Sequence, residues 1–362
     1  MAEALRVGQR LRQAVAEGVT PGAAFGLVAG GQVVRTWFVG HHAPGGPLAG
    51  PETRWDLASL TKPLTTVAWC SQLVEDGRLD LAAPLGDLLP VADAALARAP
   101  VALLLTHTAG LAAHRPYFEG LGPMVLRTGR HASARLAIRR MLLQSEPESP
   151  PGAVERYSDL GFLLLEAACE AVDGPLAQAW ARLPFHGPDA LHFRPLPAAT
   201  DARYAATERC PWRGRLLQGE VHDDNCWTLG GIAGHAGLFG TLDAALAAVM
   251  ALLAGARGAR VPYPPALFEG LSPRWMHPLG TFVRGFDTPT PGASSSGTRF
   301  GRTAFGHLGF TGTSFWIDPA ADVAMVLLTN RVCPSRDDTR IRWLRPAVHD
   351  AAWAALEVSR ET

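Results

Sequence analysis

Hydrophobic and polar residues follow one another along this chain in two different periods. Residues 3–17 repeat apolar positions at helical spacing, and a Pro-Gly pair ends that pattern. The β-prone runs 23–29 and 33–40 follow, joined by Gly30-Gly31, a pair typical of a tight hairpin turn. The N-terminal part of the sequence therefore predicts a helix and then a β-hairpin.

Helical spacing dominates the middle of the chain. Apolar residues recur at that spacing from Leu60 to Val74, and Gly77 ends the predicted helix. Because proline is tolerated only in the first turn of a helix, Pro63 places Ser59 at the N-terminus of this helix. Further helices, separated by long Pro-, Gly- and Arg-rich connections, are predicted at 134–144, 160–172 and 242–254.

The β signal returns in the last quarter of the chain. A final helix at 342–358 contains Pro346, which we expect to bend it or delay its start. Strands near both termini with helices between them predict one sheet closed by the two chain ends, with a helical region inserted, which is an α+β fold. The predicted late strands are 280–286, 304–310, 313–317 and 323–329.

Composition narrows the class of protein. The 362 residues are 48% hydrophobic and 18% charged with a net charge of zero, which is typical of a globular protein and does not favour a nucleic-acid surface. The N-terminus has no basic and apolar export signal and no apolar run approaches membrane-spanning length, so we expect a soluble, cytoplasmic protein. Five cysteines without a C-x-x-C pair predict reduced, mostly buried thiols, and neither a metal nor another cofactor is predicted.

One basic residue differs from all the others. The 33 basic residues are 32 arginines and a single lysine, Lys62, which follows Ser59 by three positions. Residues three apart lie on one face of a helix, so the amine can reach the serine hydroxyl. Lysine can lose its proton in a protein whereas arginine cannot. The pattern indicates a site where proton transfer matters, and the alternative is an ordinary surface lysine.

Two further segments are candidates for the same site. Tyr157-Ser158-Asp159 precedes an apolar helix, and a tyrosine there is a general base if a nearby cation lowers its pKa from about 10. The alternative is a packed tyrosine, with Ser158 or Asp159 capping the helix. In the glycine-rich segment 305–313, glycine permits close approach of a substrate to the backbone, whereas a lone histidine such as His307 is usually structural.

Together these motifs resemble a known enzyme family. Ser59-x-x-Lys62, Tyr157-Ser158-Asp159 and His307-Leu308-Gly309, in this order and spacing, are similar to the three boxes of the penicillin-recognising serine hydrolases. The closer resemblance is to the class C-like branch that includes the β-lactamase-related carboxylesterases. The resemblance covers roughly residues 20–335, and further similar segments are 104–111, 219–225 and 230–239.

The resemblance implies a fold and a set of roles. The fold is a single β-lactamase-like domain over 1–362, with an antiparallel sheet and flanking helices (1–56 with 275–362), a mainly helical subdomain (57–274) and the site between them. Ser59 would be the nucleophile, and Lys62 and Tyr157 together would be its base. The backbone N–H groups of Ser59 and Phe310 would form the oxyanion hole, in which losing one donor typically costs about 2.7–4 kcal/mol of barrier. Substrate-binding positions would be His307, Gly309 and Asp159.

Two departures from the family pattern bear on the substrate. The third box is usually Lys-Thr-Gly in β-lactamases, so His307 replaces a permanent charge with a side chain that we expect to be partly protonated near neutral pH. Asp159 stands where many members carry asparagine, and its negative charge would repel an acidic ligand. Both changes favour neutral esters over β-lactams and cell-wall peptides.

The sequence therefore predicts a carboxylesterase that acts on a small-molecule ester, or possibly amide, through an acyl-Ser59 intermediate. The alternatives are a β-lactamase or D-amino-acid-releasing peptidase, an acyltransferase, and an inactive binding module of the same fold. Structural roles near the cleft are predicted for His107, His222 and His235. The cluster 222–224 lacks a second spaced His/Cys group, so a metal site is not favoured.

Overall fold

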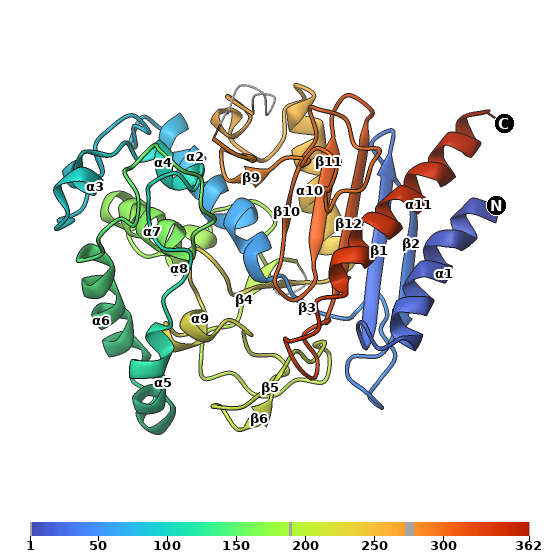
Figure 1. Cartoon of the computed structure of the whole chain (residues 1–362), viewed down its shortest axis with the longest axis horizontal. Helices are drawn as coiled ribbons and strands as arrows, with labels where there is room; N and C mark the ends of the chain where they lie inside the picture. The colour runs from blue at the N-terminus through green and yellow to red at the C-terminus, as the bar shows by residue number, and fades with distance from the viewer. Residues whose placement is uncertain (1, 188–189, 272–278, 362) are drawn as a thin grey trace.

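A seven-stranded antiparallel sheet with the order β2-β1-β12-β11-β10-β9-β8 forms one half of the protein (Figure 1). The structure is a computed structural model that describes residues 2–187, 190–271 and 279–361. The strands of this sheet are β1 (Gly22–Ala29), β2 (Gln32–Gly40), β8 (Phe282–Val283), β9 (Phe286–Asp287), β10 (Phe305–Leu308), β11 (Ser314–Asp318) and β12 (Val323–Thr329).

The two ends of the chain meet in this sheet, as the sequence predicts. Strand β1 pairs with β12 from Ala23 opposite Thr329 onward, and with β2 on its other side. Gly30 and Gly31 have φ values of +60° and +71°, which a two-residue hairpin turn requires. The predicted strand at 280–286 is wrong in detail, because the chain turns back between β8 and β9 and forms a short hairpin.

Alternate side chains of each strand enter two separate cores. Phe25 and Leu27 of β1 pack under α1 (Ala2–Ala16) and α11 (Ile341–Glu361), which lie side by side on one face (Figure 1). Ala24 and Val28 point to the opposite face, where α10 (Leu242–Ala256) packs against β1, β11 and β12. Helix α11 begins at Ile341 and continues through Pro346, so the proline does not delay its start.

The other half of the protein is mainly helical, with α7 (Asp159–Asp173) at its centre. The predicted helix at 134–144 is confirmed as α6 (His131–Leu143). The sequence analysis missed α5 (Tyr117–Thr128), in which two glycines and a proline obscure the periodicity. The remaining helices are α2 (Ala68–Glu75), α3 (Ala94–Arg98), α4 (Ala102–Leu105), α8 (Leu176–Trp180) and α9 (Asp224–Thr228), with 3-10 turns at Leu85–Asp87 and Pro265–Leu267.

Short strands connect the two halves. A three-stranded sheet consists of β3 (Trp55–Asp56), β7 (Leu238–Gly240) and β4 (His192–Phe193), and β5 (Arg209–Cys210) pairs with β6 (Arg215–Leu216). All five cysteines are buried and unpaired, which confirms the prediction of reduced thiols. Within the described ranges, no helix has both the length and the apolar character needed to cross a bilayer.

Candidate active site

The segment after β3 presents Ser59 on a strained turn. Instead of one regular helix, the chain forms a 3-10 turn (Ala58–Leu60), a π-helical segment (Lys62–Val67) and then α2. Ala58 has a φ of +48°, which is unusual for a residue with a side chain. The carboxylate of Asp56 holds this turn, because it accepts hydrogen bonds from the backbone N–H of Ala58 (2.8 Å) and of His222 (2.7 Å). The sequence analysis assigned no role to Asp56.

Lys62 is completely buried beside Ser59. Its Nζ donates hydrogen bonds to Ser59 Oγ (3.1 Å), Asp159 Oδ1 (2.7 Å) and the carbonyl oxygen of His235 (3.2 Å). Three acceptors match the three protons of an ammonium group. Burial by itself would lower the pKa of Lys62, but the negative charge of Asp159 outweighs burial and raises the pKa above its ordinary value. Lys62 therefore rests as a cation.

Asp159, the first residue of α7, pairs with the Lys62 ammonium and also contacts the imidazole of His114. Burial would raise its pKa, but the adjacent Lys62 ammonium holds the pKa of this carboxyl well below its usual range. Its second oxygen, Oδ2, is 3.5 Å from Nδ1 of His114, and this contact raises the pKa of His114. Asp159 lies against Lys62 and is not among the residues that line the pocket described below, and its role in substrate binding stays a prediction.

Tyr157 completes the group around Lys62. The Lys62 Nζ lies 4.8 Å from the centre of the Tyr157 ring, which also packs against His107 at 4.5 Å between ring centres. Burial raises the pKa of the Tyr157 phenol above its ordinary value even though the positive charge of Lys62 acts in the opposite direction. The condition under which Tyr157 would serve as a base, a pKa lowered by Lys62, is therefore not met in the resting protein, in which Tyr157 is a neutral phenol. Ser158, not Asp159, caps α7 by accepting a hydrogen bond from Gly161 N–H (3.1 Å).

His307 in β10 is neutral rather than partly charged. Its Nδ1 donates to the carbonyl oxygen of Leu308 (2.8 Å), which leaves Nε2 as an acceptor, and Nε2 is buried without a partner among the described residues. Burial lowers the pKa of His307 to about 3. The expectation of partial protonation near neutral pH is therefore wrong, because burial and the positive charge of Lys62 both disfavour the charged form of His307.

Gly309 follows β10 at a point where no side chain fits. An added Cβ atom would lie 1.9 Å from Thr313 Oγ1 and 2.8 Å from the carbonyl oxygen of Leu57. Thr313 Oγ1 donates to that same carbonyl (3.1 Å), and Gly309 N–H donates to Thr313 O (2.7 Å). The glycine therefore lets the edge of the sheet pack directly against the segment that carries Ser59.

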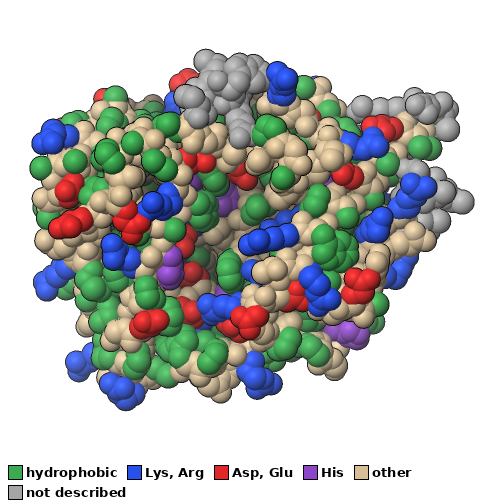
Figure 2. All heavy atoms as spheres, in the orientation of Figure 1, with side chains coloured by type: hydrophobic (Ala, Val, Ile, Leu, Met, Phe, Trp, Pro, Cys, Tyr) green, Lys and Arg blue, Asp and Glu red, His purple; other side chains and the backbone are tan. Residues whose placement is uncertain are grey.

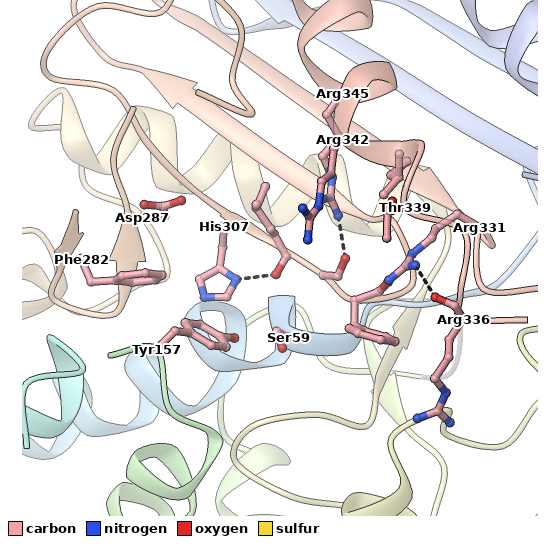
Figure 3. Close-up of a pocket in the computed structure, with 14 residues that line it drawn as sticks. Ser59, Tyr157, Phe282, Asp287, His307, Arg331, Arg336, Thr339, Arg342 and Arg345 are labelled. Carbon is pink, nitrogen blue, oxygen red and sulfur yellow. Dashed lines mark hydrogen bonds between the residues drawn. The ribbon is translucent and has the colours of Figure 1, made fainter. Parts of the chain in front are cut away.

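The three predicted boxes meet at one pocket of about 480 Å³. Figure 2 shows the hollow between the helical half and the sheet, and Figure 3 shows Ser59, Tyr157 and His307 facing one another inside it. Gly309 and the half-exposed Phe310 line the same pocket, whereas the oxyanion role of the Ser59 and Phe310 N–H groups stays a prediction. The other lining residues are Phe282, Asp287, Leu308, Arg331, Arg336, Thr339, Ile341, Arg342 and Arg345.

The three histidines for which structural roles were predicted hold loops around this pocket. His107 accepts a hydrogen bond at Nδ1 from Ser158 N–H (3.1 Å). The Nε2 atom of His222 lies 3.1 Å from Glu208, and that of His235 lies 3.0 Å from Asp223. These contacts agree with the predicted roles as hydrogen-bonding groups near the cleft.

The sequence analysis missed the arginines of this pocket. All four come from 331–345, a segment in which no motif was identified. The segment is dense in arginine, which could have indicated a positive site. Because nearly all basic residues of this chain are arginines, the density did not stand out. His114 was also missed. It is a lone histidine in a loop, and its contact with Asp159 is visible only in the folded structure.

This arrangement provides a nucleophile and a path for its proton. Ser59 Oγ, Lys62 Nζ and Asp159 Oδ1 are connected by two hydrogen bonds of 3.1 and 2.7 Å, and Ser59 opens onto the pocket. A hydroxyl that contacts a proton-transferring group inside a pocket is suited to nucleophilic, acyl-transfer chemistry.

Comparison with known proteins identifies the family of the chain. A sequence model described as Beta-lactamase matches residues 7–349. A Salmonella agona protein that carries the provisional name D-alanyl-D-alanine carboxypeptidase is 29% identical over 313 residues, which are 78% of this chain and 71% of that protein.

Solved structures with a similar fold cover almost the whole chain. EstCE1, described as a hydrolase with promiscuous acyltransferase activity, has a TM-score of 0.72 at 22% identity and covers 97% of this chain and 98% of its own. A penicillin-binding protein homologue from Caulobacter crescentus has a TM-score of 0.71 at 21% identity, with 98% of each chain covered. At these identities the similarity establishes the fold alone.

Proposed function

The chain belongs to the β-lactamase family, and from this premise we propose that it is a carboxylesterase that acts through an acyl-Ser59 intermediate. The observation that carries the proposal is the contact of 3.1 Å between Lys62 Nζ and Ser59 Oγ at the base of the pocket. The ion pair of Lys62 with Asp159 adds a proton acceptor directly behind the lysine.

In the first half of the reaction, Ser59 Oγ attacks the ester carbonyl carbon. Its proton passes to Lys62 Nζ while Nζ passes one of its own protons to Asp159, so the lysine stays an ammonium throughout. The negative charge moves from the Asp159 carboxylate to the tetrahedral oxyanion, next to the N–H groups of Ser59 and Phe310. Collapse of this intermediate expels the alcohol, which takes the proton back along the same path.

In the second half, water attacks the acyl-Ser59 ester. The water passes a proton directly to Lys62 Nζ while Nζ passes one to Asp159, and collapse of the second tetrahedral intermediate returns a proton through Lys62 to Ser59 Oγ and releases the carboxylic acid. One ester and one water thus give one acid and one alcohol. Tyr157 and His307 are neutral groups that border the reacting carbonyl, and Tyr157 can donate a hydrogen bond to the leaving oxygen.

Only the position of the third box, where β-lactamases carry a lysine, favours ester hydrolysis over β-lactam hydrolysis, and the arginines of the pocket do not distinguish the two. His307 is neutral, so that box presents no cation to a β-lactam carboxylate. The second candidate, release of a D-amino acid from a peptide, is suggested by the name of the Salmonella relative and by the arginines on the other wall of the pocket.

A fluorophosphonate probe and 4-nitrophenyl butyrate test the proposal together. We expect labelling and turnover by the native protein and neither by Ser59→Ala. A chromogenic cephalosporin is the comparison substrate, and its turnover should be much slower. Mass spectrometry of the intact protein after exposure to each substrate identifies the adduct. Normal turnover by Ser59→Ala would refute the proposed nucleophile.

A further inference from the structure

One wall of the pocket consists of arginine side chains that project from 331–345, and Asp287 lies on the other side of His307 (Figure 3). Their charges are not equally compensated. Arg336 Nε lies 2.8 Å from Glu208 and its NH2 lies 3.0 Å from Asp224, so its charge is neutralised. The other three arginines of this wall have no carboxylate within 4.0 Å in the described part of the chain.

Arg345 is a buried cation with an unused donor. It is only 7% exposed, and its NH2 donates to the carbonyl oxygens of Gly309 (2.6 Å) and Thr313 (2.9 Å). Its Nε is buried without a hydrogen-bond partner among the described residues. Burial, helped by the charge of Arg331, lowers the pKa of Arg345 to about 9. Burying a cation without a neighbouring anion costs free energy, so the unpaired charge and the unused Nε of Arg345 need an explanation.

Arg342 adds a second uncompensated charge one turn earlier on α11. Both arginines occupy the first two turns of this helix, where the helix dipole disfavours cations, and the first turn contains no acidic residue. Figure 3 shows the Arg342 guanidinium directed toward the part of the pocket that contains Ser59. Arg340, two residues earlier, is instead paired with Asp338 at 2.6 Å and lies outside the pocket.

Arg331 extends the same positive wall. Its Nε donates to the carbonyl oxygen of Phe310 (2.8 Å), and its guanidinium lies 4.6 Å from the centre of the Phe310 ring. Burial lowers its pKa. The positive wall is thus anchored to the residue whose N–H is predicted to serve the oxyanion hole, so an anion bound there is adjacent to the reacting carbonyl.

We propose that the positive wall (Arg331, Arg342 and Arg345) binds a carboxylate of the substrate, so that the preferred ester is an anionic one. This inference rests on the proposed ester hydrolysis at Ser59. A carboxylate is the anion whose two oxygens match the fork of a guanidinium group. This proposal replaces the expectation of a neutral ester, which was based only on the third box and on Asp159. Asp159 does not oppose an anion there, because its charge is neutralised by Lys62.

Two matched pairs of esters measure this preference. In the first pair the carboxylate is on the acyl side, with mono-4-nitrophenyl glutarate against 4-nitrophenyl butyrate. In the second it is on the alcohol side, with 3-butyryloxybenzoate against its methyl ester. We expect kcat/KM to favour the anionic ester by about 10-fold or more in at least one pair at low salt. Added NaCl should reduce that preference, because salt screens exposed charges.

Arg342→Gln is the decisive variant, because Arg342 is exposed and the fold does not depend on its burial. We expect it to lower the ratio of kcat/KM for the anionic ester to kcat/KM for the neutral ester by about 10-fold. Arg342→Lys should keep part of the preference because it keeps the charge. Arg340→Gln is the matched control and should keep all of it.

Direct binding separates this inference from the proposed function. Isothermal titration of the Ser59→Ala protein with monomethyl glutarate and dimethyl glutarate needs no catalysis. Tighter binding of the monoanion, lost in the Ser59→Ala and Arg342→Gln double variant, supports the positive wall even if no ester is hydrolysed. Equal binding of both compounds, equal turnover in both ester pairs, or a preference that survives Arg342→Gln would overturn it.

Discussion

Asp159→Asn is the substitution that tests the chemistry most directly. It keeps the size of the side chain and removes the charge that lies 2.7 Å from Lys62 Nζ. At that separation and an effective dielectric constant of about 20, the Coulomb attraction is roughly 6 kcal/mol before the cost of burying both charges. Breaking a buried pair by removing one partner typically costs about 3–5 kcal/mol.

In Asp159→Asn, deprotonation of Lys62 would remove this cost. Neutralising a lysine with an ordinary pKa of about 10.4 at pH 7 costs roughly 4.6 kcal/mol, which is comparable to the cost of leaving the charge unpaired. Without Asp159, burial becomes the dominant influence on Lys62. The pKa of Lys62 should therefore fall into the range that a pH–rate profile covers.

The final proton acceptor is either Asp159 or Lys62, and the two cases predict different kinetics for Asp159→Asn. If Asp159 is the final proton acceptor, kcat/KM at pH 7 falls by about 10²-fold or more, the usual contribution of general-base catalysis. In the native protein the depressed pKa of Asp159 keeps the carboxylate charged, so no loss of rate from this group appears until the solution is strongly acidic. In Asp159→Asn the residual rate depends on neutral Lys62 and should rise with pH through the neutral to alkaline range.

The assay is kcat/KM for an ester from pH 5 to 9, with thermal melting of each protein measured at the same pH values. Asp173→Asn is a suitable control, because Asp173 ends the same helix and pairs with Arg78 (2.7 Å) far from the pocket. It should keep the native profile. An Asp159→Asn protein that is folded and as active as the native one at pH 7 would show that Lys62 does not need its carboxylate and would refute the proton path.

Three further predictions follow from the same contacts. Lys62→Arg should be nearly as damaging as Lys62→Ala, at about 10²-fold in kcat/KM, because arginine keeps the charge but cannot pass on a proton; native-like turnover would contradict this. The raised pKa of His114 implies that protonated His114 competes for Asp159 below that pKa, so the native rate should rise as the pH rises through it, a step that His114→Gln should lack. Gly309→Ala should lower the free energy of unfolding by about 1–3 kcal/mol, because its Cβ would lie 1.9 Å from a threonine hydroxyl, whereas Gly120→Ala, with nothing within 4 Å, should not destabilise the protein in thermal melting.

Periodicity predicted the elements whose burial is regular. β1, β11 and β12 are buried along their whole lengths or nearly so, and α7 and α10 carry long apolar stretches, so their sequences show the pattern clearly. The elements that were missed or misjudged are short or interrupted. Helix α5 contains Pro123 and two glycines, and the hairpin of β8 and β9 turns within seven residues that read as a single strand.

The motifs identified Ser59, Lys62 and Tyr157, which the structure brings together beside one pocket, but they did not predict that burial keeps His307 neutral and raises the pKa of Tyr157. A protonation state depends on burial and on charges that are distant in the sequence. Lys62 and Asp159 are 97 positions apart, and their ion pair is visible only when α7 packs against the π-helical segment. The positive wall was missed for the same reason, since no spacing in the sequence connects Arg342 to Ser59.

Charge is distributed along this pocket in a way that favours one orientation of the substrate. At the serine end, Lys62 and Asp159 neutralise each other while Tyr157 and His307 rest uncharged. At the α11 end, Arg331, Arg342 and Arg345 have no ion-pair partner among the described residues, whereas Arg336 is paired with Glu208 and Asp224. Under the proposal, an ester that carries a carboxylate would bind with its neutral carbonyl at Ser59 and its anionic group at the positive wall. In the reverse orientation the carboxylate would face an already paired cation, and the arginines would stay uncompensated. In the β-lactamase pattern, Lys-Thr-Gly lines the reacting carbonyl and also helps to hold the substrate carboxylate. In this chain the third box lines the carbonyl, and under the proposal the positive wall holds the carboxylate.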